Sequence, residues 1–312
     1  MALEHGQNGR PPVSAAPISR VVAVINPLSG AGLDSSAATT RVAIVRESLA
    51  RVGLTPTVHV TERAGHAREL AAAAVRDGAD LLIVWGGDGT FNEVASALVG
   101  SATPLGLIPA GSGNGLAASL GVPRAPEAAL QHLLSTPPRA VDVGTFAGRP
   151  FFNIAGIGLD AHIAGLFNQR GRGRRGKWPY VAIGVRQGWT YKARRYHIEL
   201  DGDRRTVSAL LLAFANGREY GMGACISPGA LLDDGWLDAT IVEDRPAVVR
   251  FLDARHLATR TIGRARRVLL RQVRSAIVTG EEPMPYHLDG EPGVIEGTVE
   301  IGMMPGALRV RA

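Results

Sequence analysis

Short runs of apolar, largely β-branched residues alternate with helical stretches through the first 135 residues, and this alternation constrains the fold more than any other feature. Each apolar run is too short for a helix and suits a strand that is buried on both faces. Strands that alternate with helices at this spacing indicate parallel strands joined by helical crossovers. The expected strands are 21–25, 57–60, 81–85 and 105–108, and the expected helices are 36–52, 66–76, 91–99, 116–120 and 126–134.

The pattern changes near residue 140, after which short strands separated by turns dominate. Asp201-Gly202 is typical of a two-residue hairpin turn, and a single helical stretch is expected at 247–257. The sequence therefore predicts an α/β plus all-β fold. We expect residues 1–19 to form a flexible tail, 20–140 a doubly wound parallel-sheet domain, and 141–312 an antiparallel β-sandwich-like domain. Its expected strands are 151–154, 196–200, 207–214, 237–242, 267–278 and 298–301.

The charge and the cysteine content of the chain indicate the partners and the cellular compartment that suit it. The chain has 34 Lys and Arg against 28 Asp and Glu, so a basic surface would suit nucleic acid, an acidic membrane leaflet or a phosphorylated ligand. Cys225 is the single cysteine, which excludes an internal disulfide and fits a reducing cytoplasm. No apolar run reaches the roughly 18 residues of a membrane-spanning helix, and residues 1–19 lack the apolar core of a signal peptide.

One glycine-rich turn carries the clearest chemical signal. Gly86-Gly87-Asp88-Gly89-Thr90 follows an expected strand and precedes an expected helix. Glycine lets the backbone approach a ligand closely, and the helix start offers unpaired N–H groups to an anion such as phosphate. Because an acid beside phosphate needs a cation or a proton transfer to be tolerated, Asp88 is a candidate for holding Mg²⁺ or accepting a proton. The structural alternative is a plain turn in which Asp88 caps the helix.

Two further turns fall at the same edge of the predicted sheet. One contains Asn26, Pro27, Ser29 and Gly30, and the other, at 109–115, contains Ser112 and Asn114. Parallel strands place their carboxyl ends together, so the three turns can form one nucleotide cradle. Each alone could be ordinary turn chemistry. A P-loop lysine motif is absent, and the one G-x-G-x-x-G, at 171–176, has no strand before it.

Taken in order, these motifs resemble those of the diacylglycerol kinase and sphingosine kinase family of lipid kinases. The resemblance covers nearly the whole chain after the tail. It is carried by the three turns, by Thr61 and the residues after it, by Asn92-Glu93, and by the segments 156–161 and 288–292.

The resemblance implies an enzyme that uses ATP and Mg²⁺. It makes Glu291 the proton acceptor, with Asp88 as a rival, and gives Asp289 a part in Mg²⁺ binding. Asp160 would contact the hydroxyls of a lipid head group. Residues implied to bind ATP are Asn26, Pro27, Ser29, Gly30, Thr61, Gly86, Gly87, Asp88, Gly89, Thr90, Asn92, Glu93, Ser112, Asn114, Arg174, Arg175 and Lys177.

The resemblance also implies a structural Mg²⁺ held by Asp234 with the carbonyls of Leu231 and Trp236. The basic stretch that contains Arg174, Arg175 and Lys177 has membrane docking as a second use.

The acceptor alcohol stays open between diacylglycerol and a sphingoid-type lipid. A soluble-substrate kinase of the NAD kinase type and a non-catalytic nucleotide- or lipid-binding regulator are the alternatives. We expect a cytoplasmic protein that associates peripherally with an anionic membrane, where its lipid substrate lies. No nucleic-acid partner is expected, and a homodimer stays open.

Overall fold

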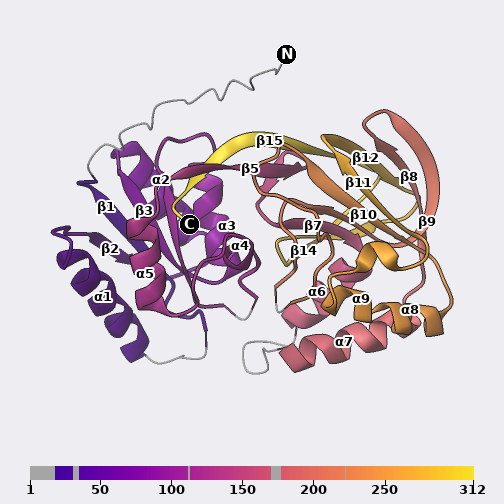
Figure 1. The fold of residues 1–312 in the computed structure, drawn as a ribbon, viewed down its shortest axis with the longest axis horizontal. Helices are drawn as coiled ribbons and strands as arrows, with labels where there is room; N and C mark the ends of the chain where they lie inside the picture. The colour runs from indigo at the N-terminus through magenta and orange to yellow at the C-terminus, as the bar shows by residue number, and fades with distance from the viewer. Residues whose placement is uncertain (1–17, 31–34, 112, 170–176, 222) are drawn as a thin grey trace, which may run out of the picture.

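The computed structural model describes residues 18–30, 35–111, 113–169, 177–221 and 223–312. Figure 1 shows two halves side by side, with the N-terminal half in indigo to magenta and the C-terminal half in pink to yellow. The N-terminal half contains β1 (Val21–Ile25), α1 (Ser35–Ala50), β2 (Thr57–Val60), α2 (His66–Arg76), β3 (Leu81–Gly86), α3 (Asp88–Leu98), β4 (Leu105–Pro109), α4 (Gly115–Ser119) and α5 (Pro126–Ser135).

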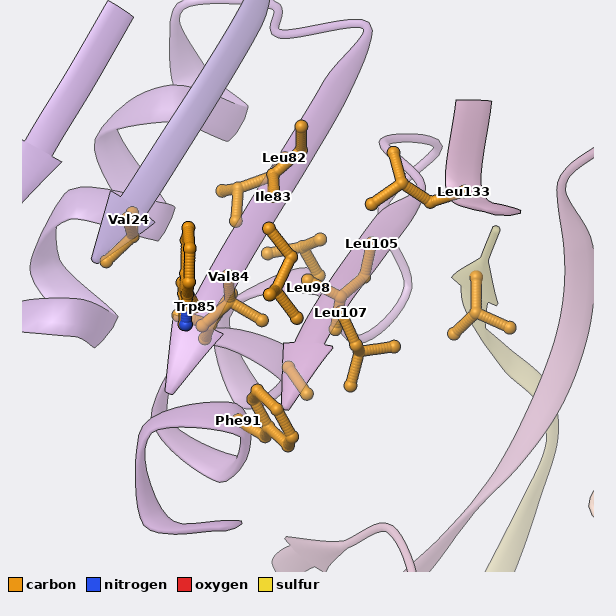
Figure 2. Close-up of a cluster of buried hydrophobic side chains, with 14 of the residues drawn as sticks. Val24, Leu82, Ile83, Val84, Trp85, Phe91, Leu98, Leu105, Leu107 and Leu133 are labelled. Carbon is orange, nitrogen blue, oxygen red and sulfur yellow. The ribbon is translucent and has the colours of Figure 1, made fainter. Parts of the chain in front are cut away.

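The strands of the N-terminal half form a parallel sheet in the order β4-β3-β1-β2. The strand order reverses between β1 and β3, which confirms the predicted doubly wound arrangement and places a ligand crevice beyond their carboxyl ends. β3 is buried along its whole length, and its side chains lie in the same hydrophobic core as those of α3 and β4. In Figure 2, Phe91 and Leu98 of α3 lie against Val84 and Leu107 of this sheet.

The C-terminal half is mainly antiparallel, as the sequence predicts. Its elements are β5 (Arg139–Phe146), β6 (Arg149–Phe151), β7 (Ile154–Gly158), α6 (Leu159–Gln169), α7 (Lys177–Thr190), β8 (Arg194–Leu200), β9 (Asp203–Ala215), β10 (Leu237–Glu243), α8 (Ala247–Asp253), α9 (Arg255–Ala258), β11 (Val268–Val273), β12 (Ser275–Gly280), β13 (Met284–Leu288), β14 (Glu291–Ile295) and β15 (Thr298–Val310), with a short 3-10 turn at Ile262–Arg264.

The last strand joins the two halves. β15, yellow in Figure 1, pairs with β12 in the C-terminal half and then runs back along β5 to the edge of β4. Leu308, Val310 and Ala312 are buried in the core of the N-terminal half. The chain therefore crosses between the halves in β5 and returns in β15.

Several predicted elements of the C-terminal half are wrong. The expected strand 151–154 is broken between β6 and β7, where Phe152 and Asn153 donate their N–H groups to Asp289. The expected strand 267–278 is two strands, because β11 pairs with β10 whereas β12 pairs with β8 and β15. Sequence patterns did not predict α6, α7, β13 or β14, and the expected helix 247–257 is divided into α8 and α9.

The Asp201-Gly202 turn is confirmed: both residues have positive φ, 48° and 86°, and they connect β8 to β9. Among the described residues, the structure contains no helix that is long and apolar enough to cross a membrane.

Candidate active site

The three glycine turns meet beyond the carboxyl ends of β1, β3 and β4. A Cβ on Gly111 would lie 2.8 Å from the Cα of Gly87, so the second and third turns touch backbone to backbone. Gly30 has φ +88°, and a Cβ there would lie 2.7 Å from the carbonyl oxygen of Ala110. Side chains at these positions would force the turns apart, and their absence leaves backbone groups facing the space above the sheet.

Arg41 of α1 holds the first turn in place. Its guanidinium donates to the backbone oxygen of Asn26 and to both the hydroxyl and the carbonyl of Ser29. The Asn26 side chain donates in turn to the Thr90 hydroxyl at 2.8 Å. The first turn is thus fastened to the start of α3, and three of the predicted nucleotide-binding side chains also serve to build the cradle.

Asp88 fastens the turn at 86–90 to the turn at 109–115. Its two carboxylate oxygens accept the N–H groups of Asn114 and Gly115, each at 2.8 Å. Asp88 is the first residue of α3, and through these two hydrogen bonds it also caps the start of α4. Burial raises the pKa of this carboxyl to about 6, helped by the negative charge of Asp289 and opposed by the two N–H donors.

The raised pKa of Asp88 predicts a pH-dependent stability difference between the protein and its Asp88→Asn variant. Between about pH 4 and 6 the folded protein holds a proton that the unfolded chain releases, so its stability falls as pH rises. The loss should reach about 3 kcal/mol by pH 7 and be absent in the variant, which has no carboxyl to ionise. Urea unfolding of both proteins at pH 4 and 7 measures this loss of stability. A loss in the wild type no larger than that in the variant would mean that Asp88 keeps its ordinary pKa.

Asp289 is a buried hydrogen-bond hub between the two halves. Its side chain accepts N–H groups from Phe152, Asn153 and Ile154 at 2.8–3.0 Å and from the Asn92 amide of α3 at 3.0 Å. Burial raises the pKa of its carboxyl, and the four donors oppose that rise. Because both carboxylate oxygens of Asp289 already accept N–H groups, this residue is better suited to position α3 against β13–β14 than to bind a metal.

Glu291 reaches across from the C-terminal half to the glycine turn. Its Oε1 lies 3.0 Å from the position that a Cβ on Gly89 would occupy. Among the described residues, its carboxylate accepts no hydrogen bond, in contrast to Asp88 and Asp289. The Glu291 side chain is exposed, but the protein atoms around its carboxyl raise its pKa by desolvation. The nearby carboxylates of Glu93 and Asp289 raise this pKa further, while Arg149 lowers it. A carboxylate with a raised pKa and free oxygens is suited to accept a proton.

Asp160, at the start of α6, belongs to a buried cluster with two residues that the sequence did not single out. Its Oδ2 accepts the Tyr220 hydroxyl at 2.9 Å and lies 3.3 Å from Nε2 of His287. Nδ1 of His287 accepts the N–H of Gly290, which assigns the proton of a neutral ring to Nε2, facing Asp160. The cluster links the Asp160 carboxylate to the turn that carries Asp289 and Glu291.

Other predicted site residues have structural partners of their own. Glu93 accepts the N–H of Gly65 at 2.9 Å, and the Asn114 side chain bonds both backbone groups of Gly111 within its own turn. The N–H of Thr61 donates to the end of β1. Ser112, Arg174 and Arg175 lie outside the described residues, as does the side chain of Lys177, the first residue of α7.

The turn predicted to hold a structural Mg²⁺ immediately precedes β10. Asp234 accepts the N–H of Trp236 at 3.0 Å, and its other oxygen accepts the Gln272 amide at 3.2 Å. Leu231 is exposed. No group of three or more His, Cys, Asp or Glu is arranged to hold a metal within the described ranges, so a metal here would depend on the two carbonyls.

Sequence reasoning missed Arg41, Tyr220, His287 and Asn153. The amide of Asn153 donates to the carbonyl of Glu219 at 2.9 Å, and its Nδ2 lies 2.5 Å from the position that a Cβ on Gly115 would occupy. Of these four residues, only His287 has a signal in the sequence, because it stands two residues before Asp289. The other three lie outside any motif, and only the folded chain brings them to the candidate site.

Comparison with known proteins agrees with this arrangement. Residues 20–146 match the family described as the diacylglycerol kinase catalytic domain, and residues 153–312 match the YegS C-terminal NAD kinase beta sandwich-like domain. A relative from Chromohalobacter salexigens named "Probable lipid kinase YegS-like" is 34% identical over 275 residues, 86% of this chain and 88% of the relative. The diacylglycerol kinase of Mycobacterium tuberculosis H37Rv is 34% identical over 72% of this chain and 74% of its own.

A solved structure has the same overall fold. A crystal structure described as a diacylglycerol kinase from Bacillus anthracis aligns with a TM-score of 0.73 over 95% of this chain and 97% of its own, at 21% identity. The two family matches thus assign the glycine turns to a diacylglycerol kinase catalytic domain, and Asp160, Asp289 and Glu291 to a β-sandwich-like domain. The chain belongs to the diacylglycerol kinase family of lipid kinases, which are phosphotransferases.

Proposed function

We propose that the protein transfers the γ-phosphate of ATP to a hydroxyl group of a membrane lipid, in a reaction that depends on Mg²⁺. The observation that carries this proposal is the approach of the Glu291 carboxylate to Gly89, which sets a free base beside the glycine turn at 86–90. The nucleotide side is formed by the three touching turns, and the acceptor side by Asp160 and Glu291 of the C-terminal half.

The residues present fit a nucleotide. Gly87 and Gly111 leave no side chain in the cradle, and α3 begins at Asp88 with N–H groups that have no partner in a preceding helical turn. Each oxygen of Asp88 accepts one N–H group and each oxygen of Asp289 accepts two, so Asp88 keeps more capacity to hold Mg²⁺ than Asp289 does, and Glu291 is left free to act as the base. When bound, the cation would neutralise phosphate charge and align the transfer.

In the proposed reaction the lipid hydroxyl gives its proton to Glu291, and its oxygen attacks the γ-phosphorus. The new oxygen–phosphorus bond forms as the bond to the bridging oxygen breaks, and the electron pair leaves with ADP. Asp160 would orient the acceptor by accepting a hydrogen bond from a head-group hydroxyl, with Tyr220 and His287 fixing its carboxylate. Asp88 keeps the two glycine turns together during the transfer.

A substrate panel tests the proposal. Purified full-length protein should transfer label from [γ-³²P]ATP to at least one of diacylglycerol, monoacylglycerol, a sphingoid base or ceramide, and chelating Mg²⁺ with EDTA should abolish the transfer. NAD without lipid serves as the soluble-substrate arm. Labelling of NAD alone would replace the lipid assignment with the NAD kinase alternative, and ATP binding without any labelled product would indicate a regulator.

A further inference from the structure

The surface formed by α7 and α8 carries an exposed apolar face. Trp189 near the end of α7 is 56% exposed, and Val248, Phe251 and Leu252 of α8 are each more than half exposed. No residue of α8 is buried. Trp189 and Phe251 line a shallow hollow of about 440 Å³ together with Arg186 and Thr190. A contiguous apolar face rimmed by charge indicates an interaction site, whereas single exposed apolar residues do not.

The segments that carry this face also hold the basic excess of the chain. Residues 177–195 contain five Lys or Arg and no Asp or Glu, and residues 245–267 contain seven Arg and one Asp. Without these two segments, the Asp and Glu residues of the chain would outnumber its Lys and Arg residues. The two segments together carry 12 basic residues and 1 acidic residue, a net charge of +11, which exceeds the net charge of +6 of the whole chain.

Some of these basic side chains are exposed beside the apolar residues. Arg186 borders the hollow, Lys192 follows Trp189 by three residues, and Arg255 follows Leu252 by three. None of these three forms a salt bridge with a described residue, whereas Arg245 and Arg250 pair with Asp253 and Asp244. Unpaired cations around exposed tryptophan and phenylalanine match the chemistry of an anionic lipid surface, where aromatic rings enter the interface and cations meet the head groups.

The surface lies close to the predicted lipid end of the active site. α7 packs against α6, whose first turn carries Asp160, and α8 packs against α7. In Figure 1 these helices run along the lower edge of the C-terminal half. A membrane that contacts α7 and α8 would thus lie one helix away from α6.

We propose that the α7–α8 face, made of Trp189, Val248, Phe251 and Leu252 with Arg186, Lys192 and Arg255 around them, docks onto an anionic lipid bilayer. This inference rests on the proposed function, because an enzyme that phosphorylates a membrane lipid must reach the leaflet. The residues of this docking face are different from those of the basic stretch that contains Arg174, Arg175 and Lys177. The apolar side chains give contact with the lipid interior, and the cations select for negative head groups.

Vesicle co-sedimentation without ATP tests the docking face. The full-length protein should bind phosphatidylcholine vesicles that contain phosphatidylglycerol at least tenfold more tightly than pure phosphatidylcholine vesicles, and added NaCl should weaken this binding. Phe251→Glu, alone and with Trp189→Ala, should reduce binding at least tenfold, since it places an acid against the leaflet. Val52→Glu is the matched control, because Val52 is also 56% exposed but lies in the N-terminal half, and it should bind as the wild type does.

Three outcomes would overturn the docking face. Wild-type binding by the Phe251→Glu variant would exclude this surface, and equal binding to neutral and anionic vesicles would exclude the role of charge. A dimer in sedimentation velocity that Phe251→Glu converts to a monomer would assign the face to a second copy of the chain. Because the vesicle assay measures binding without ATP, failure of docking and failure of the kinase proposal stay separate. Phosphorylation of detergent-dispersed lipid by Phe251→Glu at the wild-type rate would support a role confined to docking.

Discussion

Replacing Glu291 with glutamine should lower kcat about 10²- to 10⁴-fold and change the affinity for ATP little. Glutamine keeps the size of the side chain over Gly89 but cannot accept the proton of the acceptor hydroxyl. Because the structure shows no hydrogen bond to the Glu291 carboxylate from the described residues, the substitution removes no structural contact. Steady-state kinetics with the lipid identified by the substrate panel, together with ATP binding by titration calorimetry, measure both quantities.

Glu296→Gln provides the control for this experiment. Glu296 is exposed just beyond β14 and has no place in the site, so its variant should retain the wild-type kcat. A pure loss of ATP affinity in the Glu291 variant would move this residue from a base to a binding role. Asp88→Asn separates the rival base: wild-type rates in that variant would remove Asp88 from the mechanism altogether.

Replacing Asp289 with asparagine should destabilise the protein by about 2 to 6 kcal/mol. The amide NH₂ of asparagine would face two of the four N–H donors, and each buried donor left without an acceptor costs about 1–3 kcal/mol. The backbone does not oppose the change, because φ at Asp289 is +51° and asparagine tolerates this region. Urea or thermal unfolding gives the loss directly.

Asp201→Asn is a matched control for the Asp289 substitution. Asp201 also has a positive φ and accepts backbone N–H groups, from Arg274 and Ser275, but it is exposed at a hairpin where water can replace the lost acceptor. We expect its variant to lose less than about 1 kcal/mol. Equal losses at the two positions would contradict the role of Asp289 as a buried hub.

The arrangement of the glycine turns could be predicted because it depends on local sequence. Gly86–Thr90 follows a buried strand and starts a helix, and a parallel sheet brings such turns to one edge. The meeting of Gly87 with Gly111 follows from that rule. The strands β1 and β2 and the helix α2 end where the apolar pattern ends, because each is bounded by glycine, proline or polar residues.

The roles of individual acids could not be predicted, because they depend on partners far away in the sequence. Nothing near Asp88 indicates that its carboxylate caps α4, 26 residues away, and nothing near Asp289 indicates four N–H donors from two other segments. Asp88 and Asp289 appear alike in sequence as candidate ligands, yet the fold gives both a structural task and leaves Glu291 free. The helix α6 follows β7 with no loop between them, and Gly158, with φ +103°, marks the change from strand to helix. A single glycine does not distinguish the start of a helix from a surface turn, so the sequence pattern did not predict α6.

The return of β15 affects how separable the two halves are. Residues 20–140 contain every element of the parallel sheet, but their core is completed by Leu308, Val310 and Ala312 from the end of the chain. Expressed alone, this half would expose the apolar surface that these residues cover and leave the edge of β4 open. During synthesis, the half that is made first can therefore reach its final form only after residues 308–312 have left the ribosome.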